Sequence, residues 1–212
     1  FKQYTNGPPE KLQRLYAASA YKYSQMLQRV GDYTNAIQAY RYVLKAKIDE
    51  DLGAQVKIEL AELIVRSIPK WSDKSQVKAL IKEAQELAVA VQWLGYDKIW
   101  FWRAVVVMAH LEMIKGDNNA ARKIIVSHLD KLEEAESLLR QNREALKLSP
   151  MAECRYLMGT MMETQAKEFL AKDQADAARK GFREALIHYF VVLTRYPASP
   201  WAMEARKRVE WI

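Results

Sequence analysis

Two stretches decide the fold of this chain: GDYTNAIQAYRYVL at residues 31–44 and GDNNAARKIIVSHL at residues 116–129. In both, alanine stands five residues after the glycine, a large apolar residue nine after it and leucine thirteen after it. Glycine ends helices because it accepts the left-handed backbone that a tight cap needs. The repeated spacing predicts helical hairpins, which bury their apolar faces by stacking on neighbours.

The composition favours helices throughout. Of 212 residues, 50% are hydrophobic, and only 7 are Gly and 6 Pro. Between these breakers the commonest residues are Ala, Leu, Lys, Glu, Gln and Arg, which are the strong helix formers. Alternation of Val, Ile and Thr, the mark of a strand, is nearly absent. We therefore expect an all-α protein.

Breakers divide the chain into hairpins within a single domain, 1–212. Hairpins are expected over residues 9–48, 49–94, 97–147 and 150–196, followed by a terminal helix at 199–212. No breaker follows Asn118 before Ser149, so that helix is expected to continue to about Leu146, with its charged end projecting or kinked. The first helix carries an apolar row at spacings of three and four. The row comprises Leu12, Leu15, Tyr16, Ser19, Tyr23, Met26, Leu27 and Val30.

Small and aromatic residues recur around the turns. The sets are Ser24, Gly31, Ala36, Tyr40 and Leu44; Ala109, Gly116, Ala121, Ile125 and Leu129; and Gly159, Ala185, Tyr189, Leu193 and Pro197. This pattern resembles tetratricopeptide repeats. The resemblance implies a right-handed superhelical array of about four antiparallel hairpins plus a C-terminal helix. The second hairpin lacks a clean motif, and the fourth carries extra residues around 168–179.

The stretch from Tyr189 to Ala202 resembles a repeat variant common in bacterial envelope proteins, such as Tol–Pal partners and the outer-membrane assembly lipoprotein. The resemblance implies a periplasmic or envelope-associated protein, with the cytoplasm as the alternative. Local chemistry also explains the stretch, because Pro197 stops one helix and Ser199 caps the next. No apolar run approaches about 20 residues, so we expect no transmembrane segment. The sequence leaves open whether a signal or lipid anchor precedes Phe1.

Reactive residue types are few and scattered. His110, His128 and His188 lie on separate predicted helices, without Cys or paired carboxylates at metal-binding spacing. Cys154 stands among apolar residues and is expected to be a buried small hydrophobe. Phosphate loops, serine elbows and zinc-protease motifs are absent from the sequence. We expect no enzyme, no cofactor and no metal site.

A binding groove is the better candidate for function. The resemblance implies that the first helix of each hairpin lines the concave face, and a mixture of aromatic and polar residues suits an extended peptide or a partner helix. The exposed positions would be Tyr21, Gln25, Arg29, Arg103, Val106, His110, Tyr156, Thr160 and Glu163. Tyr21 and Gln25 stand where the family's clamp for acidic C-terminal peptides has Lys and Asn, so that specificity is not expected.

The aromatic run Trp93, Tyr96, Trp100, Phe101 and Trp102 packs hairpins together or, alternatively, forms a docking patch. The first functional hypothesis is a non-enzymatic scaffold for a protein or peptide. The alternative is a module for an acidic polymer such as RNA, suggested by the net charge of +7 and by Lys70, Lys74, Lys78 and Lys82. Self-association through the end after Trp201 is a third, weaker hypothesis.

Overall fold

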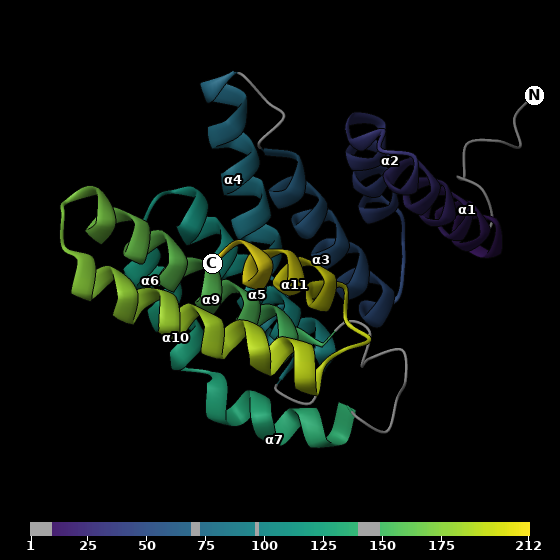
Figure 1. Cartoon of the computed structure of the whole chain (residues 1–212). Coiled ribbons are helices and arrows are strands. Elements are labelled where there is room, and N and C mark those ends of the chain that lie inside the picture. The colour runs from purple at the N-terminus through teal and green to yellow at the C-terminus, as the bar shows by residue number, and fades with distance from the viewer. Residues whose placement is uncertain (1–9, 69–72, 96–97, 140–148) are drawn as a thin grey trace, which may run out of the picture. The chain divides into compact units, whose positions relative to one another are not determined.

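The computed structural model describes residues 10–68, 73–95, 98–139 and 149–212. Within these residues every regular element is helical, so the chain is all-α, as predicted (Figure 1). The helices are α1 Glu10–Arg29, α2 Tyr33–Lys45, α3 Glu50–Ser67, α4 Lys74–Val89, the 3₁₀ turn η2 Gln92–Leu94, α5 Ile99–Ile114, α6 Asn118–Val126, α7 Leu129–Leu139, α9 Pro150–Ala171, α10 Ala175–Arg195 and α11 Pro200–Trp211.

The chain divides into two compact units, Phe1–Trp93 (unit 1) and Leu94–Ile212 (unit 2). The arrangement of all hairpins in one right-handed superhelix, within a single domain, therefore stays a prediction.

The predicted turn between the first two helices has the geometry of a Schellman motif. Gly31 has a φ of 82°, in the left-handed region. The Asp32 N–H then bonds to the carbonyl of Leu27 at 3.0 Å, which satisfies the end of α1. The Asp32 carboxylate accepts the N–H of Asn35 at 3.3 Å and so caps α2. One dipeptide ends one helix and starts the next.

Gly116-Asp117 repeats this turn between α5 and α6. The φ of Gly116 is 86°, and the Asp117 N–H bonds to the carbonyl of Glu112 at 2.9 Å. The Asp117 carboxylate accepts the N–H of Ala120 at 2.8 Å. The equal spacing in the sequence therefore reflects equal local structure.

In unit 1, helices that are consecutive in the sequence pack on each other: α1 on α2, α2 on α3 and α3 on α4. The inward face of α2 carries Ala36, Ile37, Tyr40 and Val43. α3 contacts both α2 and α4, and it is buried on most of its sides. Its buried residues include Val56, Ile58, Leu60, Leu63 and Ile64.

α1 packs through a face other than its apolar row. Among residues 15–29, whose side chains are described, the buried ones are Ala17, Tyr21 and Ser24, and the side chain of Leu12 lies outside the described part. Small residues there allow the two helix backbones to approach closely. The predicted row lies largely on the opposite side, in solvent. Its exposed fractions are 57% for Leu15, 59% for Tyr16, 58% for Tyr23, 63% for Met26 and 78% for Val30.

In unit 2, α9 is the central helix. It forms a hairpin with α10, and α5, α6, α7 and α11 also contact it (Figure 1). Glycine is required where α9 meets Tyr189 of α10, because a Cβ on Gly159 would lie 2.6 Å from the ring carbon Cε1. α9 is consequently buried over most of its length.

The helix expected to run from Asn118 to about Leu146 breaks after Val126. The Ser127 hydroxyl donates to the carbonyl of Ile124 at 3.0 Å, and the His128 N–H bonds only three residues back, to Ile125. These local bonds compete with the regular helical pattern. The break lets α7 contact α9. The predicted end of the helix, near Leu146, lies outside the described residues.

A third turn of the same kind closes α9, with aspartate in place of glycine. Asp173 has a φ of 58°, and the Gln174 N–H bonds to the carbonyl of Phe169 at 3.0 Å. We expect Asp173→Gly to raise the free energy of unfolding by about 0.5–1 kcal/mol, because glycine accepts this backbone without strain.

Gly116→Ala is the matched variant for Asp173→Gly, because it replaces glycine at a left-handed turn and should change stability in the opposite direction. No atom lies within 4 Å of the added Cβ, so backbone strain alone should lower the free energy of unfolding by about 1–2 kcal/mol. Urea denaturation of both variants beside the parent protein measures the two effects. Changes of the same sign would contradict the proposed role of the left-handed turns.

Candidate functional site

The nine predicted binding residues divide between the two units. Tyr21, Gln25 and Arg29 belong to unit 1, and the other six belong to unit 2. The structure brings some of them together within each unit, but it buries several that were expected to be exposed.

Tyr21 is an interior residue rather than an exposed one, with an exposed fraction of 7%. Its hydroxyl donates to Glu59 Oε1 at 2.8 Å and accepts from Gln25 Nε2 at 2.8 Å. Tyr40 donates its hydroxyl to Glu59 Oε2 at 3.0 Å. Tyr21 and Gln25 therefore connect α1 to α3, whereas Arg29 is exposed.

Arg103 and Val106 of α5 are also buried, at 7% and 2% exposure, which corrects the expected groove. The reason is that α5 is apolar on all sides and is covered on most of them. The Arg103 guanidinium carbon lies 5.1 Å from the centroid of the Trp100 ring. His110 is partly exposed, and its Nε2 lies 3.1 Å from Glu153 Oε1.

The aromatic run near the start of unit 2 does not form one surface. Phe101 and Trp102 are buried and make an edge-to-face contact with centroids 4.9 Å apart. Trp93, in unit 1, is 88% exposed, and Tyr96 lies outside the described residues. The buried pair has a packing role, as predicted; a docking role for Trp93 stays a prediction.

Tyr156, Thr160 and Glu163 lie on one face of α9, but α11 and α10 cover most of it. Tyr156 is 9% exposed, with its ring centroid 5.1 Å from that of Trp201 on α11. Glu163 is 2% exposed. Thr160 is half-buried, and its hydroxyl donates to the carbonyl of Leu157 at 2.8 Å. The expected exposure of Tyr156 and Glu163 is therefore wrong.

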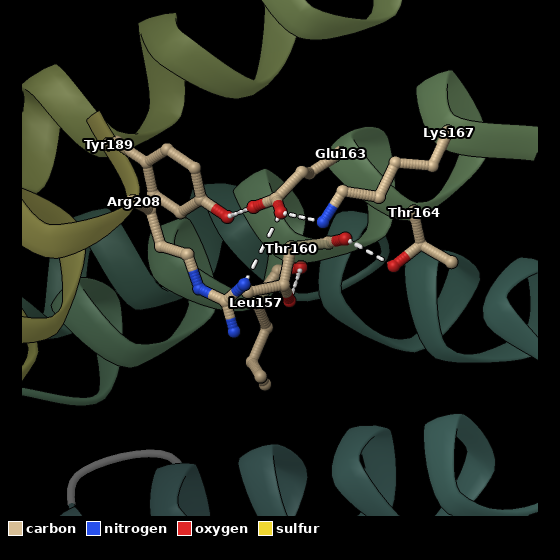
Figure 2. Close-up of polar contacts among 7 residues, drawn as sticks. All are labelled: Leu157, Thr160, Glu163, Thr164, Lys167, Tyr189 and Arg208. Atoms are coloured by element: carbon tan, nitrogen blue, oxygen red, sulfur yellow. Dashed lines mark hydrogen bonds and ion pairs between the residues drawn. The ribbon is translucent and has the colours of Figure 1, made fainter. Parts of the chain in front are cut away.

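Glu163 is instead the centre of a polar cluster (Figure 2). Its Oε2 accepts the Tyr189 hydroxyl at 2.8 Å. Its Oε1 accepts from Lys167 Nζ at 2.6 Å and from Arg208 Nη1 at 3.3 Å. Burial acts to raise the pKa of Glu163, but Lys167, Tyr189 and Arg208 outweigh it and hold the pKa below its ordinary value. The carboxylate is thus ionised and fixes two cations in place.

These two cations border a shallow, open hollow of about 510 Å³ between α9 and α11. Lys167 Nζ lies 4.0 Å from the centroid of the Trp211 ring, within cation–π range. Lys207 lies 2.9 Å from Glu204 in an exposed ion pair. The lining residues are Lys167, Glu204, Lys207, Arg208 and Trp211. Such a site offers N–H donors for an anionic or amide group and an indole for an apolar one.

The sequence of α11 contains a signal for this hollow. Glu204, Lys207, Arg208 and Trp211 follow the spacing of one helical face. The apolar residues Ala202, Ala205 and Val209 mark the other face of α11, the one that packs in unit 2. Only the position of α11 beside α9 shows that its charged face meets Lys167.

Two side chains with altered pKa values, Cys154 and His188, are buried and half-buried in unit 2. Cys154 is 2% exposed, as expected for a small hydrophobe, and burial raises the pKa of its thiol. Burial, together with Arg155 and Arg122, lowers the pKa of His188 to about 4. At neutral pH the thiol is protonated and this imidazole is uncharged. Across the described residues, no three His, Cys, Asp or Glu side chains form a group that could hold a metal ion.

In the part of the chain with described coordinates, no helix combines the length and apolarity needed to cross a bilayer. No protein-family model, curated protein or solved structure matches the sequence. The likeness to tetratricopeptide repeats thus stays an interpretation of the residues, and the geometry of the hollow is the basis for a functional proposal.

The depressed pKa of Glu163 predicts a pH-dependent contribution to stability. A carboxylate of this kind stabilises the fold fully above its unfolded pKa of about 4.3, and the stabilisation is lost as the pH falls through the folded value. We expect Glu163→Gln to lower the free energy of unfolding at pH 7 by about 1–3 kcal/mol. The difference from the parent protein should shrink below about pH 4.3.

Urea unfolding at pH 7 and at pH 3 measures both effects. Glu168→Gln is the matched control, because Glu168 is exposed on the same helix. An equal loss of stability in the control, or a difference that does not shrink between pH 7 and pH 3, would contradict the assignment.

Proposed function

We propose that this protein is a non-enzymatic scaffold that binds a segment of another protein in the hollow of unit 2. The observation that carries the proposal is the arrangement of Lys167, Lys207 and Arg208 around one open space beside the Trp211 ring. Arg and Trp are the residue types that most often dominate binding energy at protein interfaces.

The cations are held in position before a partner arrives. Glu163 is almost completely buried, whereas the side chains of Lys167 and Arg208 are 43% and 45% exposed. The buried carboxylate therefore orients both cations from the protein side and leaves part of each side chain accessible to solvent. Side chains that are already ordered lose less entropy on binding. A carboxylate on an extended segment of a partner is the group that this arrangement suits best.

The identities of the lining residues support binding rather than catalysis. The hollow contains three cations, one carboxylate and an indole, and its five lining residues include no Ser, Cys or His. Such a set supplies hydrogen bonds, charge and apolar surface. The thiol of Cys154 is protonated at neutral pH and buried within the core of unit 2.

We place this scaffold in a bacterial envelope complex, with the cytoplasm as the alternative. The support is the likeness of Tyr189–Ala202 to envelope repeat variants. Subcellular fractionation of the source cells, with an antibody to the chain, distinguishes the two compartments.

A screen of fluorescently labelled peptides tests the hollow. We expect peptides with Asp or Glu beside an apolar residue to bind, and Trp211→Ala to weaken that binding at least about tenfold. Lys207→Ala should weaken the binding of acidic peptides more than the binding of uncharged ones. Lys180→Ala is the matched control, because Lys180 is exposed on α10 and is not part of the hollow.

Two results would overturn the proposal: peptide binding that is insensitive to Trp211→Ala and Lys207→Ala, or an equal effect of Lys180→Ala. Circular dichroism of each variant checks that the helices are retained.

An acidic polymer such as RNA is the second candidate, and exposed lysines on α4 favour it. Lys74, Lys78 and Lys82 recur every four residues and are all exposed, whereas Lys70 lies outside the described residues. Lys82 makes only a loose contact with Glu86, at 3.8 Å. Phosphate binding would make the affinity fall steeply with salt, and each lost lysine would reduce the slope by about one.

We expect a shallow salt dependence for peptide binding and weak retention of a labelled RNA at 150 mM salt, about the physiological ionic strength. Fluorescence anisotropy with Lys78→Ala and Lys82→Ala distinguishes the candidates. RNA binding that weakens steeply with salt and with these variants would reverse the ranking.

A further inference from the structure

The exposed apolar row of α1 forms one continuous stripe on the side of the helix opposite to its packed face. Tyr16, Tyr23 and Val30 follow one another at intervals of seven residues, and Met26 follows Tyr23 by three. Each of these four side chains is at least 58% exposed. At 100° per residue they fall within an arc of about 80°, which is the seam of a coiled coil.

A seam of this kind normally faces another helix. In heptad terms, Tyr16, Tyr23 and Val30 occupy position a, and Ser19 and Met26 occupy position d. Large apolar side chains that are exposed together, rather than singly, mark interaction sites. The regular alternation of three and four along α1 favours a helical partner over an extended one.

The charges beside the stripe distinguish between partners. Lys22 and Arg29 are both exposed and both occupy position g, next to the seam. Residues at g pair with residues at e of a parallel partner and with residues at g of an antiparallel one. In a parallel second copy Lys22 would meet Leu27, and in an antiparallel one Lys22 and Arg29 would meet like charges. A second copy therefore satisfies neither cation.

We propose that α1 docks an amphipathic helix of another protein, one that carries Glu or Asp along the border facing Lys22 and Arg29. The partner's apolar residues interdigitate with Tyr16, Tyr23, Met26 and Val30. This surface belongs to unit 1 and shares no residue with the hollow of unit 2. The inference goes beyond the proposed function, because it assigns a second binding surface with its own partner chemistry.

Synthetic helices test the proposal with the full chain. The probe is a labelled peptide about three heptads long, with Leu at a and d and Glu at e and g. A second peptide has Lys at e and g, and a third has the composition of the first in scrambled order. We expect the Glu peptide to bind at least about tenfold more tightly than either of the others.

Three variants identify the surface. The double change Tyr23→Ser and Met26→Ser should weaken the binding of the Glu peptide at least about tenfold. Lys22→Glu with Arg29→Glu should reverse the preference, so that the Lys peptide binds better. Phe190→Ser, which changes another half-exposed aromatic, should leave binding unchanged. All of these chains also carry Trp211→Ala, because the hollow of unit 2 is itself expected to bind acidic peptides and must be disabled in the comparison. Failure of this proposal is therefore distinguishable from failure of the proposal for the hollow.

Equal binding of the scrambled peptide, or binding unaffected by the Tyr23/Met26 double variant, would overturn the proposal. Sedimentation equilibrium adds a separate outcome. A dimer of the chain that Met26→Ser dissociates would assign the stripe to a second copy and would also overturn it.

Discussion

Within each of the two units, hydrogen bonds from tyrosine hydroxyls to carboxylates join helices that pack on one another. In unit 1, Tyr21 and Tyr40 donate to the two oxygens of Glu59. In unit 2, Tyr189 donates to Glu163, and Tyr196 donates to Glu136 at 2.7 Å. Each bond joins two different helices, or a helix and the end of another, so it fixes how one lies on the other.

Such bonds constrain the residues around them. A carboxylate removed from water is costly unless its oxygens are fully paired. Glu136 meets this requirement with the Ser149 hydroxyl at 3.1 Å as well as Tyr196. Glu163 meets it with Lys167 and Arg208, whose exposed parts then border the hollow. The same pairing thus serves packing in the interior and charge placement at the surface.

Turns and helix ends were predictable from the sequence, whereas the face through which a helix packs was not. The Gly31-Asp32 and Gly116-Asp117 turns and the approximate ends of most described helices follow from residue type, because capping is decided within a few residues. The packed face of α1 was not predictable, because Ala17 and Ser24 fit the closer contact although the larger apolar residues lie elsewhere. Sequence periodicity gives the width of a stripe but not its partner.

The candidate site shows the same division. Tyr156 and Glu163 were found as members of one face of α9, but α11 buries them, and no local pattern shows where a later helix will lie. The break at Ser127-His128 is not marked by glycine or proline. Local bonds of Ser127 and His128 interrupt the helix there, and α7 contacts α9 beyond the break.

Gly159, which has no side chain, connects the packing of the core of unit 2 to the arrangement of charges at its surface. The Tyr189 ring fills the space that a Cβ would need, and the same ring delivers its hydroxyl to Glu163. A single methyl group there would displace the ring, loosen the carboxylate and release the cations beside the hollow. An interior position can therefore change how the charges beside the hollow are placed, although it lies on no surface itself.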